Sequence, residues 1–191
     1  MSTLATNRRA YRLWGFAIAA IVLAIDLFVK GLVMGPLALR TRPEGQIELL
    51  PFFRLTFTKN FGVSLGMFTA DSAEMRLALV AVTLTIAIVV LVWMLKERKL
   101  GDIAALALVL GGALGNIRDR ALYGYVIDYA DLHFGEWRPF LIFNIADAAI
   151  SLGVVIILAR ALFLREKPAL HSDNQESGPA PTADGTAAET K

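Results

Sequence analysis

Two aspartates occupy positions in this sequence where a charge is costly, which makes them the first candidates for chemistry. Asp147 lies within the otherwise uncharged apolar segment from Pro139 to Ala159. Asp128 closely follows a polar cluster, GGALGNIRDR at 111–120, at the end of another apolar segment. A charge at mid-bilayer costs about 3 kcal/mol even on a lenient scale, so intramembrane carboxyl groups usually face a protein interior and serve a function. Two carboxyl groups brought together at a membrane surface indicate acid–base chemistry.

The chemistry of such a pair is well defined. Two carboxylates that lie close together do not ionise easily at the same time, so one apparent pKa rises and the pair shares a proton near neutrality. The ionised partner can deprotonate a water molecule. The protonated partner can stabilise a tetrahedral intermediate and then protonate the leaving amine. Ser151 has no Lys or His near it in sequence, so no serine nucleophile competes in that segment. For Asp147 alone, the alternative is a hydrogen bond between helices.

Residues with directed hydrogen-bonding groups accompany both aspartates. Asn116, Asp119 and Arg120 are spaced i, i+3 and i+4, which places them on one helix face at a membrane boundary. Asn144 and Asp147 share a face in the fourth apolar segment by the same spacing rule. Asn and Arg hold carboxylates through directed hydrogen bonds, and Arg does so in a bidentate way. We interpret these residues as a preorganised site. An ordinary polar helix end is the alternative for the first three.

Two further spacings in the apolar segments have a structural and a functional interpretation. Asp26 and Lys30 are separated by four residues, so they form an ion pair or orient substrate or the outer part of the protein. Gly111, Gly112 and Gly115 lie late in the third segment, and the step from Gly111 to Gly115 lets helix backbones approach closely. Packing alone explains the glycines.

The composition indicates a membrane protein built as one domain. The chain has 191 residues, of which 56% are hydrophobic, and its mean hydropathy is +0.57. Soluble domains contain about 45–50% apolar residues, and a membrane-spanning helix needs about 20 of them in succession. Four segments qualify: about Leu13 to Met34, Leu77 to Leu95, Ile103 to about Tyr123, and Pro139 to about Leu162.

Several classes of function are excluded by composition. A net charge of +2 is too small to indicate nucleic-acid binding. The chain has no Cys, which excludes disulfides, thiolate nucleophiles and Cys-ligated metals. His133 and His171 are too few and too far apart for a recognisable metal motif.

Clusters of basic residues predict that both termini are cytoplasmic. In a four-span arrangement, one set of span ends carries Arg8, Arg9, Arg12, Lys96, Arg98, Lys99, Arg160, Arg165 and Lys167. The opposite ends carry basic residues too, so the prediction depends on clustering in the short loop at 96–99 and in the N-terminal flank. A cleavable signal peptide is the alternative for the first span. The apolar stretch continues through Asp26 to Met34 without a convincing cleavage site, which favours an uncleaved span.

One region outside the spans has the periodicity of a strand. Between Gln46 and Met67, Phe53, Leu55 and Phe57 alternate with polar residues, and glycines follow. We predict an all-α membrane protein, a bundle of four transmembrane helices with a small extracytoplasmic β-ribbon or platform at about 45–68. An N-terminal cytoplasmic segment at 1–12 precedes the membrane domain at 13–165. The tail at 166–191 has a disordered composition.

Five motifs in order give the chain a resemblance to a known family. They are DLFVK at 26–30, NFGVSLGMF at 60–68, GGALGNIRDR at 111–120, VIDY at 126–129 and FNIAD at 143–147. This combination resembles bacterial lipoprotein signal peptidase, the type II signal peptidase, over about Tyr11 to Leu164. The resemblance implies an aspartyl peptidase of the bacterial inner membrane, without metal or organic cofactor. It also implies a four-helix bundle with an outer β-platform.

The resemblance further implies specific residues, substrates and an inhibitor. The catalytic pair maps onto Asp128 and Asp147. Supporting positions map onto Asp26, Lys30, Asn60, Gly62, Asn116, Asp119, Arg120 and Asn144. The implied substrates are diacylglyceryl-modified prolipoproteins, which the family cuts just before the lipid-modified cysteine. The cyclic peptide globomycin is the implied inhibitor, and the active site is expected on the periplasmic side, next to membrane lipid.

Three other functions use similar residues. An ion- or proton-coupled carrier also contains intramembrane Asp, Asn and Lys, but the chain shows no internal repeat and four spans are few for a carrier. A non-enzymatic lipoprotein chaperone would bind substrate without needing either carboxyl group. The other main type of intramembrane aspartyl protease has a Gly-x-Gly-Asp signature, which is absent at Asp128 and Asp147.

Overall fold

The computed structural model describes residues 2–62 and 73–163. The elements in chain order are α1 (Ser2–Met34), β1 (Gln46–Leu50), β2 (Phe53–Asn60), α2 (Ala73–Lys96), α3 (Leu100–Tyr123), β3 (Val126–Leu132) and α4 (Ile145–Phe163). The predicted tail at 166–191 and the last part of the predicted platform, 63–68, lie outside the described residues.

Four of the described helices are long and apolar enough to cross a membrane: Arg8–Met34, Ala73–Lys96, Leu100–Tyr123 and Ile145–Phe163. The predicted fold class is confirmed. The fourth span begins six residues later than predicted, at Ile145 instead of Pro139. The reason is local, because Asn144 caps the helix and the residues before it are extended or irregular.

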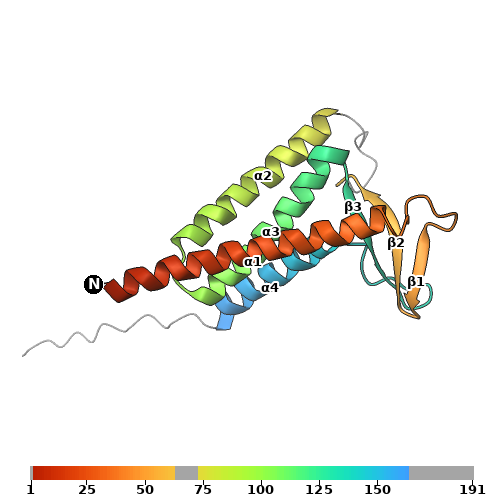
Figure 1. Cartoon of the computed structure of the whole chain (residues 1–191). Coiled ribbons are helices and arrows are strands. Elements are labelled where there is room, and N and C mark those ends of the chain that lie inside the picture. The colour runs from red at the N-terminus through yellow and green to blue at the C-terminus, as the bar shows by residue number, and fades with distance from the viewer. Residues whose placement is uncertain (1, 63–72, 164–191) are drawn as a thin grey trace, which may run out of the picture.

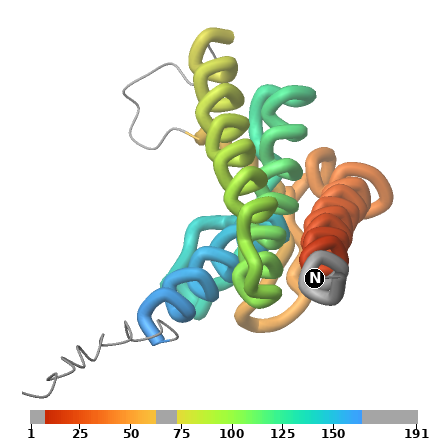
Figure 2. The backbone as a smooth tube through the Cα atoms, turned by 90° about the vertical axis from the view of Figure 1, so that its left-hand side faces the viewer, coloured from red at the N-terminus to blue at the C-terminus, as the bar shows by residue number. Residues whose placement is uncertain are grey.

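The helix α3 is the centre of the bundle and packs against the other three helices. Figures 1 and 2 show α1, α2 and α4 arranged around it, with the start of α1 and the ends of α2 and α4 at the end away from the strands. Small residues permit this packing. Gly111 faces the backbone of α1 at Ala19, and Gly112 faces the backbone of α4 at Ala146. The close approach predicted from these glycines is confirmed.

The sheet lies across the other end of the bundle and has three antiparallel strands in the order β1-β2-β3. The hairpin β1–β2 corresponds to the predicted ribbon. The third strand was not predicted, because Val126 to Asp131 is buried throughout and its sequence, VIDYAD, does not alternate between apolar and polar residues. Its pairing with β2 places Asp128 opposite Thr58.

An apolar cluster fixes the sheet to the bundle. Val33 at the end of α1 and Leu39 beyond it are fully buried against Ile127 and Tyr129 of β3. Apolar side chains of β2, including Phe57, pack onto the same cluster. The orientation of β3 relative to the helices is therefore set by a hydrophobic contact on one face of the strand, and this leaves Asp128 on the other face.

The close packing of α3 against α4 can be tested by a substitution at Gly112. A Cβ atom there would clash with the carbonyl oxygen of Ala146 and lie 2.9 Å from Ile150 Cγ1. We expect Gly112→Ala to destabilise the protein by about 1–3 kcal/mol, because α4 must shift. The measurement is thermal unfolding in detergent, followed by tryptophan fluorescence.

The matched control is Gly31→Ala, since a Cβ atom at Gly31 meets none of the described residues within 4 Å. This variant should be as stable as the parent or slightly more so, because Ala favours helix. Equal losses from the two substitutions would contradict the packing explanation.

Candidate active site

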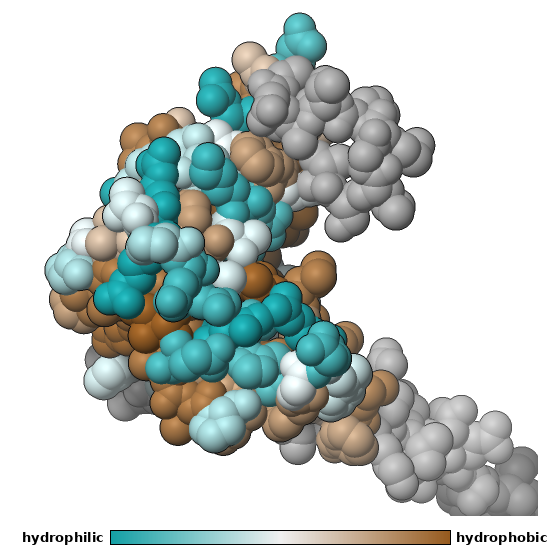
Figure 3. Space-filling model, turned by 90° about the vertical axis from the view of Figure 1, so that its right-hand side faces the viewer, coloured by the Kyte–Doolittle hydropathy of each residue, from teal (hydrophilic) through white to brown (hydrophobic). Residues whose placement is uncertain are grey.

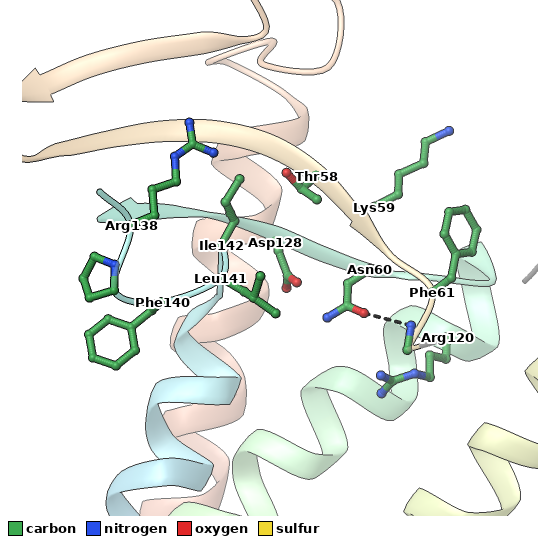
Figure 4. Close-up of a pocket in the computed structure, with 12 residues that line it drawn as sticks. Thr58, Lys59, Asn60, Phe61, Arg120, Asp128, Arg138, Phe140, Leu141 and Ile142 are labelled. Atoms are coloured by element: carbon green, nitrogen blue, oxygen red, sulfur yellow. Dashed lines mark hydrogen bonds between the residues drawn. The ribbon is translucent and has the colours of Figure 1, made fainter. Parts of the chain in front are cut away.

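Asp128 lies in a pocket where the sheet meets the helix ends. Its side chain is only 1% exposed. The pocket has a volume of about 770 Å³, and Figure 4 shows the carboxyl group between the β2 strand and the connection that leads into α4. The lining residues are Thr58, Lys59, Asn60, Phe61, Gly62, Arg120, Asp128, Arg138, Pro139, Phe140, Leu141 and Ile142. Asp128 therefore comes from a strand, and not from a helix end as the sequence indicated.

Asp147 lies in the first turn of α4, where it takes part in a capping box. The Asn144 Oδ1 atom accepts a hydrogen bond from the Asp147 backbone N–H at 2.9 Å. In return, Asp147 Oδ2 accepts one from the Asn144 backbone N–H at 3.3 Å. Such reciprocal bonds satisfy two donors that a helix start would otherwise leave unpaired. Asn144 is thus the cap of the helix, and not a residue on its face as predicted.

The two aspartates converge on Asn144. Its Nδ2 group donates to Asp128 Oδ1 at 2.6 Å, while its backbone N–H reaches Asp147. The pairing of Phe143 with Ala130 of β3 fixes this position, because both backbone N–H groups donate to the opposite carbonyl oxygen, at 3.1 and 2.8 Å. One residue therefore holds a strand carboxyl group and a helix carboxyl group together.

Asn116 completes the contacts around Asp147. Its Nδ2 group donates to Asp147 Oδ1 at 2.7 Å. Its Oδ1 atom accepts from Asn144 Nδ2 at 3.3 Å and from Lys30 Nζ at 3.4 Å. Because a cation and an amide N–H both face this oxygen, the amide of Asn116 has one preferred orientation, with its donor toward Asp147.

The environments of the two aspartates differ. The pKa of Asp128 is raised to about 6, chiefly by burial and then by the negative charge of Asp147. Hydrogen bonds from Asn60 and Asn144 and the charge of Lys30 oppose this rise. Asp147 is half-buried and lies at the start of a helix, where the helix dipole favours a negative charge. Burial and the neighbouring carboxylate thus favour the protonated form of Asp128 relative to a carboxyl group in water.

A buried ion cluster lies beneath the pair. Lys30 Nζ is 2.8 Å from Asp26 Oδ2 and 2.8 Å from Asp119 Oδ2, and all three side chains are at most 2% exposed. The ion pair predicted for Asp26 and Lys30 is thus present, with Asp119 as a third member.

Each carboxylate of this cluster also binds a backbone N–H group next to a candidate catalytic residue. Asp26 Oδ1 accepts from the N–H of Ala146, which precedes Asp147. Asp119 Oδ2 accepts from the N–H of Ile127, which precedes Asp128. Gly115 leaves room for this, because a Cβ atom there would meet Asp26 Oδ2. We name Asp26, Lys30 and Asp119 the buried clamp, since they tie the two backbones to one ammonium group.

Arg120 does not form the bidentate hydrogen bonds with the aspartates that the sequence suggested. It lines the pocket, and its buried Nε has no hydrogen-bond partner among the described residues. Among the same residues, Arg120 forms no salt bridge with Asp128 or Asp147, because no nitrogen of its guanidinium group lies within 4.0 Å of their carboxylate oxygens. Its guanidinium group is available for a molecule that enters the pocket.

Asn60 and Gly62 form the pocket wall opposite the α4 connection. Asn60 Oδ1 accepts from the backbone N–H of Gly62 at 2.8 Å, as Figure 4 shows, and Asn60 also hydrogen-bonds to Asp128. Gly62 has a φ of +78°, a value that favours glycine. A Cβ atom at Gly62 would lie 3.4 Å from the Arg120 guanidinium group, so the glycine also keeps this side of the pocket open.

Comparison with known families decides the classification. A family model described as Signal peptidase (SPase) II matches residues 18–163. The chain belongs to this family. The matched region contains every candidate site residue, from Asp26 to Asp147, and ends at the last residue of α4.

Individual relatives of this signal peptidase II family member agree. The chain is 50% identical to a lipoprotein signal peptidase of Sphingopyxis alaskensis over 164 residues, which cover 86% of this chain and 94% of the relative. It is 48% identical to one of Rhizorhabdus wittichii over 174 residues, with 91% and 99% covered. A solved bacterial membrane enzyme superposes with a TM-score of 0.67 at 28% identity, covering 78% of this chain and 92% of that chain.

Sequence reasoning missed part of the peptidase's site. The connection at 138–142 forms a pocket wall, but its residues 139–142 were included in the predicted fourth span, and Thr58 was not singled out. One signal was available, since Asn144 and Asp147 have the spacing of a helix cap followed by its third residue. That signal would have begun the helix at Ile145 and freed the preceding residues to form the pocket.

The buried clamp makes a measurable prediction for stability. Lys30→Met leaves two buried carboxylates without their cation, which should cost about 3–5 kcal/mol. Unfolding of the peptidase in detergent checks this value. Adding Asp119→Asn should recover part of the loss, because one uncompensated charge is removed.

Arg160→Met is the control. It removes a cation from Asp102, with which Arg160 pairs at 2.5 and 3.3 Å, and both side chains are about a quarter exposed, at 26% and 23%. The expected cost is at most about 1 kcal/mol. If Lys30→Met cost no more than Arg160→Met, the clamp would not be a major stabilising element.

Proposed function

We propose that this peptidase removes the signal peptide from prolipoproteins and cuts just before a diacylglyceryl-modified cysteine. Membership of the signal peptidase II family supports the substrate class. The observation that carries the proposal is the convergence of Asp128 and Asp147 on Asn144, with Asp128 open to a pocket at the end of the spans. A peptide bond at this level can reach water while the signal helix and the lipid chains remain in the bilayer.

In the proposed mechanism the two carboxyl groups have different tasks. Asp147, ionised at the start of α4, deprotonates a water molecule that attacks the scissile carbonyl carbon. Asp128, protonated before the reaction, donates a hydrogen bond to the carbonyl oxygen and stabilises the tetrahedral intermediate. The C–N bond then breaks, and the leaving amine takes a proton from the pair. Asn116 and Asn144 hold both carboxyl groups in place through the bonds described above.

Other pocket residues are suited to hold the substrate. Arg120 lines the pocket, so its guanidinium group can donate to a substrate carbonyl or to the developing oxyanion. Asn60 and Gly62 end the β2 strand beside Asp128, so an extended peptide can lie against them. A cyclic peptide of the globomycin type is expected to occupy the same pocket and to compete with the substrate.

The arrangement of the helices supports an orientation in the bacterial inner membrane. The basic loop that contains Lys96, Arg98 and Lys99 lies at the opposite end of the bundle from the sheet, together with the start of α1 and the end of α4 (Figure 1). Basic loops remain in the cytoplasm. Both termini are therefore assigned to the cytoplasm, and the pocket to the periplasmic side.

Each aspartate can be tested by removing only its ability to ionise. Asp147→Asn and Asp128→Asn should each lower the rate of cleavage by about 10³-fold or more, as in other sites whose residues act as a unit. The assay uses the purified protein in lipid vesicles and a synthetic lipidated precursor, with products identified by mass spectrometry. A precursor without the diacylglyceryl group tests the substrate class separately.

Asp102→Asn is the matched control, because Asp102 lies in the first turn of α3, on the far side of the bundle. It should cleave at the parental rate. Undiminished cleavage by Asp147→Asn would exclude the proposed mechanism. Substrate binding without cleavage by the parent protein would favour a chaperone, and proton-dependent uptake without cleavage would favour a carrier.

The pH dependence follows from Asp128. Its pKa is raised to about 6, and the mechanism requires its protonated form. As pH rises through this value the protonated fraction falls, so kcat/KM should decrease about tenfold per pH unit on the alkaline side. Asn60→Ala removes a hydrogen bond that favours the carboxylate, and should therefore move this decrease to higher pH. A pH profile identical to that of the parent would exclude Asp128 as the proton donor.

A further inference from the structure

A set of apolar side chains is exposed beside the pocket, outside the spanning helices. Leu50 and Phe52 lie at the turn between β1 and β2, and Phe134, Trp137, Phe140 and Leu141 lie between β3 and α4. Their exposed fractions run from 43% for Phe52 to 86% for Leu141. We name these six residues the outer apolar edge. Several exposed apolar side chains in neighbouring segments mark a candidate interaction site.

The outer apolar edge is an ordered structure. The rings of Phe52 and Phe134 are stacked with centroids 6.3 Å apart, and those of Phe134 and Trp137 lie 5.7 Å apart. The backbones of Phe134 and Trp137 exchange hydrogen bonds of 2.8 and 3.3 Å, and the His133 N–H donates to the Phe52 carbonyl at 3.0 Å. These contacts join the two turns, so their aromatic rings are presented together.

The length of α4 indicates where this edge lies relative to the hydrocarbon core of the bilayer. The helix has 19 residues, which corresponds to about 28 Å, close to the roughly 30 Å thickness of the hydrocarbon core. Ile145 therefore lies near one boundary of the core. Leu141 precedes it by four residues, a chain length of at most about 14 Å. Leu141, at one end of the edge, thus lies within about 14 Å of this boundary, a distance comparable to the thickness of the headgroup layer.

The face of the molecule at the sheet's end carries hydrophilic groups over much of its area (Figure 3). Figure 3 looks onto the sheet from the side away from the helices and shows hydrophilic groups across the middle, with apolar groups toward the left and lower margins. Arg138, which is 48% exposed, adjoins Trp137 and pairs with Asp131 at 3.5 Å. A cation and an indole ring side by side suit the boundary between headgroups and acyl chains.

We propose that the outer apolar edge inserts into the interfacial layer of the bilayer on the sheet's side and holds the pocket wall at 138–142 against the lipid. The edge is continuous along the chain with the lipid-facing surface of α4, where Leu152 and Val155 are 53% and 60% exposed. This continuity favours lipid over a second copy of the chain as its partner. The inference depends on depth and exposure, and not on which peptide the pocket cleaves.

Site-directed spin labelling tests the insertion. The chain has no Cys, so Trp137→Cys gives a single labelling position in the full-length protein. After reconstitution into phosphatidylcholine–phosphatidylglycerol vesicles, collision of the nitroxide with oxygen, which concentrates in lipid, is compared with collision with a water-soluble nickel chelate. Leu152→Cys is the lipid-facing control. Glu44→Cys, at an exposed position between α1 and β1, is the water-facing control.

The expected ratio of oxygen to nickel accessibility at position 137 is close to that at 152 and several-fold above that at 44. A ratio equal to that at position 44 would overturn the proposal, because the edge would face water. Protection from both reagents would overturn it too, because another protein surface would cover the edge. If Trp137→Cys does not fold, Leu50→Cys on the β1–β2 turn gives the same reading.

Discussion

The site depends on the burial of one ammonium group between two carboxylates. Lys30 cannot be withdrawn from water unless its charge is compensated, and Asp26 and Asp119 provide this from two different helices. These carboxylates also accept hydrogen bonds from the backbone N–H groups of Ile127 and Ala146. The electrostatic requirement of the buried clamp therefore determines where the strand and the helix that carry the reactive groups can lie.

The rest of the fold makes this arrangement possible. Glycines on α3 let α1 and α4 pack closely against it, so that Asp26 of α1 reaches the backbone of α4. The sheet then closes the end of the bundle, and its apolar contact with Val33 and Leu39 orients β3. The result is a polar site at the boundary of the membrane that is enclosed by protein on the helix side and accessible from the pocket side.

The sequence was most informative at residues whose transfer into a membrane is energetically unfavourable. Asp128, Asp147, Lys30 and their polar neighbours could be selected because charges and amides are rare in apolar spans, and the spans themselves followed from length and hydropathy. Local patterns could not locate β3, because a buried strand has no alternation, nor the extended residues before α4, because their apolar composition imitates a helix. Both depend on pairing between distant segments, such as Ala130 with Phe143.

The capping box at the start of α4 has a consequence for drug resistance. Asp147 closes the first turn of the helix through the same carboxylate that is proposed to activate water. If Asp147 activates water as proposed, an inhibitor that binds this carboxylate contacts a residue whose replacement removes the reactive group and, for most side chains, also the capping hydrogen bond. Escape mutations should therefore accumulate in the exposed pocket wall, at positions such as Phe140 and Leu141, where a change of side chain costs the fold little.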